Sequence, residues 1–171
     1  MGGHAAGGKP RTRKRGEPVC TITDFVETLL GLQGSQRRVV LEFSIVFRDR
    51  YFDVTLTGIP TVETLDNYLE ALVNHENWQP GSLVLTDEIG LDASSISTQV
   101  GRSLAATALR WRKELGPAQI AIFVADDLQF GMNRMWGAFI ENQWDGVAGL
   151  FRSQEEALTW LMTRRGPSPS S

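Results

Sequence analysis

The chain has 171 residues, enough for one domain with a buried core, and its shares of hydrophobic (42%) and charged (22%) residues are those of an ordinary globular protein. No apolar run is long enough to span a membrane, and the N-terminus lacks the apolar stretch of a signal peptide. The single cysteine, Cys20, excludes an internal disulfide and fits a reducing cytoplasm, while two histidines are too few for a structural zinc site.

The net charge of −3 is unevenly distributed along the chain. Residues 1–20 contain five basic residues and one acid, whereas the remainder contains 12 basic residues and 19 acids. We interpret residues 1–20 as a disordered basic arm, because so little apolar surface cannot offset the entropy of ordering. Residues 164–171 (RRGPSPSS) are expected to be a disordered tail for the same reason. A mildly acidic body is atypical of nucleic-acid-binding domains, so we expect nucleic acid to bind weakly at most, through the arm.

Between these termini, residues 21–163 alternate between strand and helix patterns and are predicted to form one domain. A short amphipathic helix is expected within 24–32 (DFVETLLGL), ending at Gly31 or at Gly34. Two β-rich runs at 38–47 and 51–59, separated by a polar turn, predict a hairpin. Short apolar runs typical of buried parallel strands follow at 81–87, 118–125 and 146–151. Apolar residues at helical spacing predict four further helices, which start after Thr61, span 98–115, start after Asp126 or Asp127, and start after Ser153.

This order of elements predicts an α/β fold. We expect a mixed, mostly parallel sheet of about five strands, with an N-terminal antiparallel hairpin and with helices packed on the sheet. The loops that follow parallel strands gather at one edge of such a sheet, where α/β proteins usually bind ligands.

Acidic residues follow two of the predicted strands. After the strand at 81–87 come Asp87, Glu88 and Asp92, and after the strand at 118–125 come Asp126 and Asp127. Five carboxylates near one edge could hold Mg²⁺ and serve a magnesium-dependent phosphohydrolase. Such a site also needs a cation for the transferring charge, yet the body has one lysine, inside a predicted helix, and no Gly-rich phosphate loop. The favoured alternative is that Asp126 or Asp127 caps a helix and that Asp87 ends its strand.

Aromatic and sulfur-containing side chains suggest a large apolar interior. Trp136 belongs to a helical stripe that is expected to face inward, made of Met132, Met135, Trp136, Phe139 and Ile140. Core packing is the favoured interpretation of this stripe, and an apolar ligand pocket or an interface is the alternative. Ser94 and Ser95 are expected to cap a helix, with phosphorylation as the alternative use.

Three segments carry recognisable motifs. The first (75–97) contains a strand ending in Asp87, and the third (147–161) contains a final strand and a helix that reads "EEALTWL". The second (118–139) matches at Asp127, Phe130, Gly131, Arg134 and Met135. With these motifs, over roughly residues 39–162, the chain resembles the STAS-like superfamily. It is most similar to small bacterial stand-alone STAS or lipid-transfer-like domains, which are related to anti-sigma-factor antagonists.

The resemblance implies a bacterial, cytoplasmic, non-enzymatic domain that regulates or binds a protein partner. The lipid-transfer-like relatives imply instead a carrier or sensor of a small apolar ligand or lipid. Some antagonists are switched by phosphorylation of a Ser or Thr that follows an aspartate and has a glycine close behind. Asp92, Ser94 and Ser95 occupy that place here, but Ser95 is followed by Ile96 rather than glycine.

The sequence therefore assigns no residue to catalysis, to a cofactor or to a metal. The candidate ligand or interface residues are Asp87, Asp92, Ser94, Ser95, Asp127, Phe130, Arg134 and Trp136. In addition, Arg134 is expected to pair with a nearby acid, and Gly131 is expected to allow close contact between its helix and the sheet. A homodimer remains an open expectation.

Overall fold

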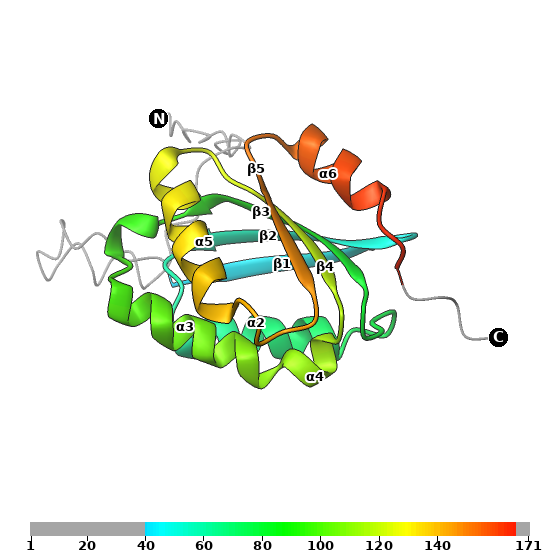
Figure 1. The fold of residues 1–171 in the computed structure, drawn as a ribbon, viewed down its shortest axis with the longest axis horizontal. Coiled ribbons are helices and arrows are strands. Elements are labelled where there is room, and N and C mark those ends of the chain that lie inside the picture. The colour runs from blue at the N-terminus through cyan, green and yellow to red at the C-terminus, as the bar shows by residue number, and fades with distance from the viewer. Residues whose placement is uncertain (1–39, 167–171) are drawn as a thin grey trace, which may run out of the picture. The chain divides into compact units, whose positions relative to one another are not determined.

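Five strands form one sheet in the order β1-β2-β3-β4-β5 (Figure 1). The computed structural model describes residues 40–166. β1 (Glu42–Arg48) and β2 (Tyr51–Gly58) are antiparallel, and β3 (Leu83–Leu91), β4 (Gln119–Phe123) and β5 (Val147–Phe151) continue the sheet in parallel. The predicted mixed sheet with an N-terminal hairpin is confirmed. The predictions for residues 1–20, for the helix at 24–32 and for the end of the tail (167–171) lie outside the described residues.

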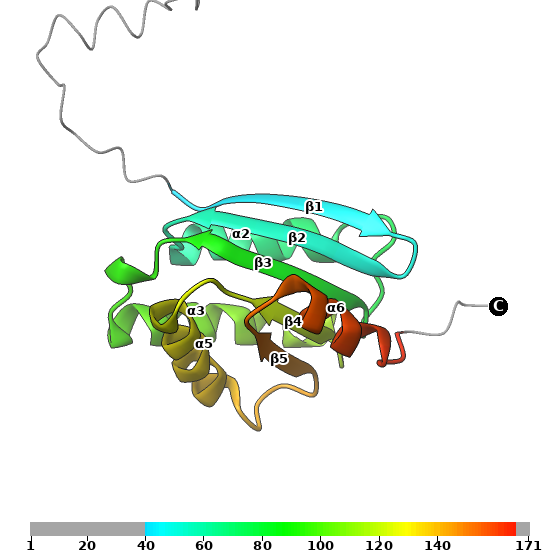
Figure 2. The ribbon, with the colours of Figure 1, turned by 90° about the horizontal axis from the view of Figure 1, so that it is seen from above.

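Helices cover both faces of the sheet (Figure 2). On one face lie α2 (Val62–Val73), α3 (Thr98–Arg110), the short α4 (Arg112–Leu115) and α5 (Asp127–Ile140). On the other face lies α6 (Gln154–Met162), which packs against β3, β4 and β5. A short 3₁₀ helix, η1 (Ala93–Ser95), follows β3.

Three of the predicted helix starts are confirmed at the residues expected. Thr61, Asp126 and Ser153 each accept a hydrogen bond from the backbone N–H three residues later, at 3.2, 2.8 and 3.2 Å. Asp126 is therefore the N-cap of α5, in agreement with the helix-cap interpretation of the acidic pair.

The helix expected over 98–115 is divided in two at Trp111. Its indole N–H donates to Asp66 Oδ1 of α2 at 2.8 Å, and the neighbouring Arg110 forms an ion pair with the same oxygen at 2.9 Å. The carboxylate of Asp66 thus holds the end of α3 against α2, and α4 starts one residue later.

β3 is longer than the sequence predicts, and Asp87 does not end it. The sequence after Asp87 is typical of a loop. In the structure, however, this stretch still pairs with β2, and the last pair is Leu91 opposite Gly58. The register shifts between Thr55 and Thr57, so β3 carries an extra residue in this stretch. β4 ends opposite Asp87, which leaves the last four residues of β3 paired with β2 alone.

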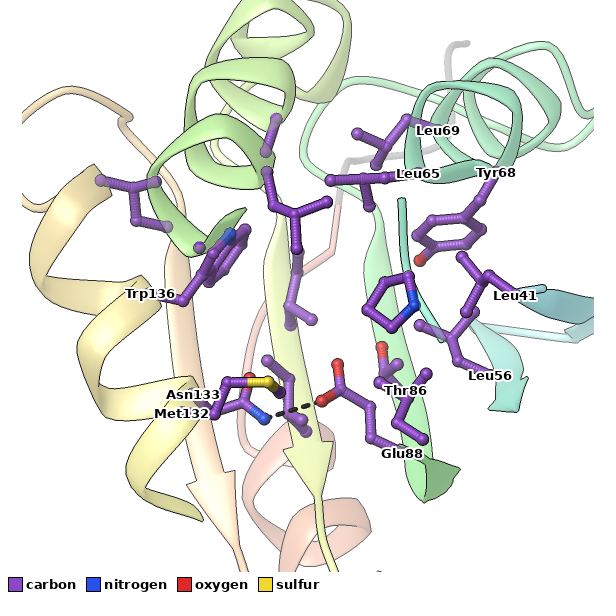
Figure 3. Close-up of a pocket in the computed structure, with 18 of the residues that line it drawn as sticks. Leu41, Leu56, Leu65, Tyr68, Leu69, Thr86, Glu88, Met132, Asn133 and Trp136 are labelled. Atoms are coloured by element: carbon purple, nitrogen blue, oxygen red, sulfur yellow. Dashed lines mark hydrogen bonds between the residues drawn. The ribbon is translucent and has the colours of Figure 1, made fainter. Parts of the chain in front are cut away.

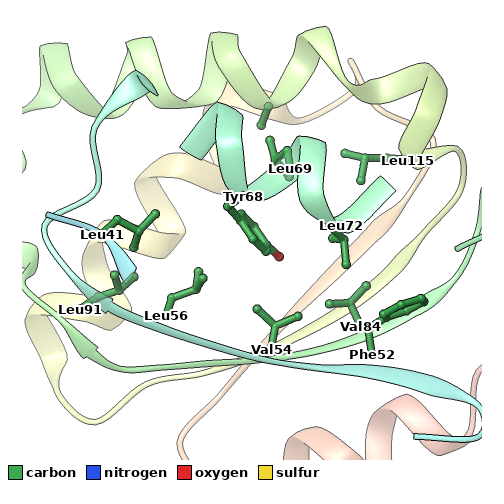
Figure 4. Close-up of a cluster of buried hydrophobic side chains, with 11 residues drawn as sticks. Leu41, Phe52, Val54, Leu56, Tyr68, Leu69, Leu72, Val84, Leu91 and Leu115 are labelled. Carbon is green, nitrogen blue, oxygen red and sulfur yellow. The ribbon is translucent and has the colours of Figure 1, made fainter. Parts of the chain in front are cut away.

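Two groups of buried side chains lie on the two faces of the sheet. The larger group lies between the sheet and the helices α2, α3 and α4 (Figure 4). The smaller lies under α6 and is formed by Leu83, Leu85, Ala121, Phe123, Ala157 and Leu161. Because alternate residues of β3 enter different groups, the sheet connects the two.

α5 differs from the predicted apolar stripe. Its buried residues are Gln129, Asn133 and Ile140, whereas Met132, Met135, Trp136 and Phe139 are half-buried. Gly131 does not allow a close contact with the sheet, because a Cβ added there would meet nothing within 4 Å. The close approach lies instead at Gly101 of α3, where a Cβ would come within 2.9 Å of Met135 Cε.

Candidate functional site

A cavity of about 120 Å³ lies between the sheet and the helices α2, α3 and α5 (Figure 3). Its wall is predominantly apolar, with leucines from α2 and α3, isoleucines from β4, and Met132, Met135 and Trp136 from α5. Trp136 was a predicted site residue and does line this cavity. Phe139 does not, and its ring lies 5.6 Å from the guanidinium carbon of Arg102.

Besides the indoles of Trp136 and Trp144, four polar side chains line the cavity: Tyr68 of α2, Thr86 and Glu88 of β3, and Asn133 of α5. Glu88 Oε2 accepts a hydrogen bond from Asn133 Nδ2 at 2.7 Å. Glu88 Oε1 accepts no hydrogen bond from any residue in the range 40–166, and Figure 3 shows the carboxyl group turned toward the cavity. Glu88 and Asn133 are each only 9% exposed. The cavity is thus an apolar chamber with one carboxyl group in its wall.

Burial shifts the protonation of two of these groups. It raises the pKa of Glu88 to about 7; the hydrogen bond from Asn133 opposes this shift, and the negative charge of Asp87 adds to it. The pKa of Tyr68 is also raised, first by burial and then by the nearby Glu88 carboxylate, while Thr86 opposes the shift. Tyr68 therefore keeps its hydroxyl proton, and Glu88 changes its charge near neutral pH.

Gln129 holds α5 against the end of β3. Its Nε2 lies within 3.0 Å of the carbonyl oxygens of Glu88, Ile89 and Leu91, and its Oε1 accepts from Ala125 N at 2.8 Å. These carbonyls belong to the stretch of β3 that β4 leaves unpaired. One buried amide thereby satisfies backbone groups that the sheet does not, and it fixes the position of Asn133 one turn later.

The predicted acids do not converge on a metal. Glu88 faces the cavity, Asp87 lies at the neighbouring position of the same strand and so faces the opposite side of the sheet, and Asp126 caps α5. Asp87 Oδ1 accepts from Ile89 N at 2.9 Å. Among residues 40–166, no group of three or more His, Cys, Asp or Glu side chains is placed to hold a metal ion.

Two other sets of predicted site residues do come together. Asp92 Oδ1 accepts from the backbone N–H of Ser94 at 3.0 Å and from its hydroxyl, while Ser95 Oγ lies 3.5 Å from Oδ2. Asp127 forms an ion pair with Arg152, whose guanidinium carbon lies 4.3 Å from the centre of the Phe130 ring. Both sets lie at the edge of the sheet where the parallel strands end.

Arg134 was expected to pair with a nearby acid, and this prediction is wrong for the described part of the chain. Arg134 lies exposed on α5, and none of the ion pairs within residues 40–166 includes it. Asp127, seven residues earlier on the same helix, pairs instead with Arg152 from the loop after β5.

Sequence reasoning missed Tyr68, Thr86 and Asn133 as cavity residues and considered Glu88 only as one of several edge acids. One signal was present: Gln129 and Asn133 are polar, four residues apart, and lie on the same face of a helix that otherwise looks apolar there. Buried polar side chains need partners, so such a pair indicates a polar group opposite the helix.

No described helix is long and apolar enough to cross a bilayer. No protein-family model matches the chain, and no curated protein matches it at a significant level. The fold is similar to the crystal structure of an uncharacterised protein of the DUF3478 family from Shewanella loihica PV-4, described as having a SpoIIAA-like fold. The two chains are 21% identical, the match covers 71% of this chain and 93% of the other, and the TM-score is 0.48. The words SpoIIAA-like fold describe that structure, and the likeness concerns fold alone.

Proposed function

We propose that this domain binds a small, mainly apolar molecule in the cavity between the sheet and the helices α2, α3 and α5, without a catalytic step. The observation that carries the proposal is the cavity itself, whose wall is apolar and contains few polar groups. Concave, preformed sites with a few converging polar groups are the usual form of small-molecule sites.

The volume of the cavity limits the size of the ligand. An apolar cavity of roughly 150 Å³ is known to accept benzene, so about 120 Å³ suits a molecule on the order of six non-hydrogen atoms. Met132 and Met135 line the cavity and can adjust to the shape of a ligand, because thioether side chains are flexible. A lipid chain is far larger than this volume and would have to extend out of the cavity, so a small apolar ligand is favoured over the lipid alternative.

The test is benzene binding to the full-length protein and to a variant with a filled cavity. Benzene at ten times its dissociation constant should stabilise the wild type by about 1.4 kcal/mol and raise its melting temperature by a few degrees. Ala108→Met, in the cavity wall, should abolish this rise, whereas Ala106→Met, exposed on the same helix, should retain it. An equal rise in both variants would refute binding in this cavity.

A protein-interaction or regulatory role is the second candidate. It is favoured by exposed apolar side chains at the edge where the parallel strands end, among them Ile89 and Leu128, which are 53% and 56% exposed. The two side chains belong to neighbouring segments, because Gln129, which follows Leu128 in α5, donates a hydrogen bond to the Ile89 carbonyl oxygen. The Asp92, Ser94 and Ser95 turn and the Asp127, Phe130 and Arg152 contact lie at the same edge.

This second role is tested by affinity purification from the native host. A specific partner should be recovered with the wild type and with Val147→Lys, whose exposed position lies at the start of β5, and should be lost with Leu128→Lys. Recovery of the same protein with all three chains would mean that this edge does not bind it.

A further inference from the structure

We infer that Glu88 is the polar anchor of the cavity and that the preferred ligand is a small apolar molecule with one hydroxyl group, such as a phenol or an alcohol. This inference rests on the proposed binding function and adds the chemical class of the ligand. Its basis is the arrangement of Glu88, Asn133, Tyr68 and Thr86 around otherwise apolar walls.

Glu88 has one oxygen to offer a ligand. Asn133 donates to Oε2 at 2.7 Å and fixes the carboxyl group, while Oε1 has no hydrogen-bond partner within residues 40–166. Glu88 is 91% buried and its carboxyl group turns into the cavity, so bulk water has limited access to this oxygen. This oxygen borders the open space of the cavity and is not enclosed by protein atoms, so a ligand that donates a hydrogen bond can reach it and give it the partner that the described residues do not supply.

The groups around Glu88 favour a hydroxyl over other donors. The oxygen atoms of Tyr68, Thr86 and Glu88 all turn toward the inner part of the cavity (Figure 3). Because Thr86 interacts with the Tyr68 oxygen, the pair keeps one hydroxyl proton, that of Tyr68, for a ligand oxygen, whereas the ionised Glu88 can only accept. A ligand hydroxyl both donates and accepts, so it can satisfy both kinds of group, and an ammonium cannot accept.

The remaining part of the cavity wall determines the chemistry of the remaining part of the ligand. The positions contributed by α3 and β4 are glycine, alanine, leucine and isoleucine, which offer no side-chain hydrogen bonds. Beyond its single polar group, a ligand is therefore expected to be a hydrocarbon ring or a short chain.

The experiment compares phenol with toluene, which has nearly the same shape and lacks the hydroxyl, by calorimetric titration of the full-length chain at about pH 8.5, where Glu88 is ionised. Wild type should bind phenol at least tenfold more tightly than toluene, because a hydrogen bond to a charged group is among the stronger ones. Glu88→Met should bind both with similar affinity. Glu88→Gln keeps an acceptor for Asn133 and should show an intermediate preference, which covers the case in which the methionine variant does not fold.

Each other outcome is decisive. If both probes bind wild type equally, the polar anchor is refuted while the cavity remains a binding site. If neither binds, the proposed function itself fails. If aniline binds more tightly than phenol, the ligand class is an amine and the assignment of a hydroxyl is overturned.

Discussion

Glu88 shows how one residue can couple protonation to stability. Its carboxyl group lies in an apolar cavity, where the charged form is disfavoured. Burial raises its pKa from an ordinary 4.5 to about 7. Between these two values, the folded state holds a proton that the unfolded state has released. The free energy of unfolding must therefore fall as the pH rises through this window, and the loss is complete above about pH 7.

We expect this effect to disappear in Glu88→Gln, which cannot be charged. Between pH 5 and pH 8, the free energy of unfolding of the wild type should fall by roughly 2–3 kcal/mol relative to that of the variant. Urea unfolding of both proteins at several pH values measures the difference. Glu76→Gln, at an exposed position after α2, is the matched control and should run parallel to the wild type. Parallel curves for Glu88→Gln and wild type would contradict the burial of a titrating Glu88.

At the scale of elements, α5 combines a strong start with a weak interior. Asp126 caps its N-terminus, and Gln129 ties its first turn to β3. The interior contains Gly131 and Gly137, where an added Cβ would meet nothing within 4 Å. Glycine inside a helix loses more conformational entropy on folding than alanine. These two glycines therefore weaken α5 without a packing function that the structure shows.

We predict that Gly131→Ala stabilises the protein. The expected gain is about 0.5–1 kcal/mol in the free energy of unfolding, read from the midpoint of urea unfolding. Gly116→Ala provides the contrast, since Gly116 has φ 58° and ψ −150°, and a Cβ there would lie 2.7 Å from Pro80 Cβ. That variant should lose about 1–3 kcal/mol. A loss in Gly131→Ala would mean that this position has a neighbour within the folded protein.

At the scale of the whole molecule, one sheet carries two cores. Leu83 and Leu85 of β3 pack under α6, whereas Val84 and Thr86 of the same strand face α2 and the cavity. Neither core can lose its packing without disturbing strands that belong to the other. We therefore expect the described domain to unfold in one cooperative transition, although α6 lies alone on its face.

Leu161→Ala tests this coupling. Leu161 of α6 is fully buried against the sheet, and its truncation should cost about 2–5 kcal/mol. Because the cores share β3 and β4, circular dichroism and the fluorescence of Trp136 and its neighbours on the far face should report the same lowered midpoint. Leu128→Ala, at a position 56% exposed, should leave the midpoint almost unchanged. Two separate transitions in Leu161→Ala would show that α6 unfolds independently.

Local chemistry in the sequence was sufficient to predict much of the fold. The caps at Thr61, Asp126 and Ser153, the hairpin, and the alternation of apolar runs with helical stripes depend on residues a few positions apart. Signals between residues close in sequence can be read from the sequence alone, so the mixed, mostly parallel sheet could be predicted without knowing any long-range contact. The predicted site residues are less well determined. Trp136 lines the cavity, but Asp87 does not end its strand, Ser97 rather than Ser94 or Ser95 caps α3, and Arg134 is in none of the described ion pairs. That Asp87, Asp92, Ser94, Ser95, Asp127, Phe130 and Arg134 contact a ligand or a partner remains a prediction.

The tertiary structure decided the site. The extension of β3 past Asp87 depends on ladder partners in β2, and it places Glu88 on the cavity face and Asp87 on the other. The meeting of Glu88 with Asn133 joins residues 45 positions apart, and the ion pair of Asp127 with Arg152 joins residues 25 apart. No spacing in the chain encodes such contacts, because they follow from how the strands and α5 pack together. The sequence determined which elements form, and packing determined that a buried carboxyl group meets an apolar cavity.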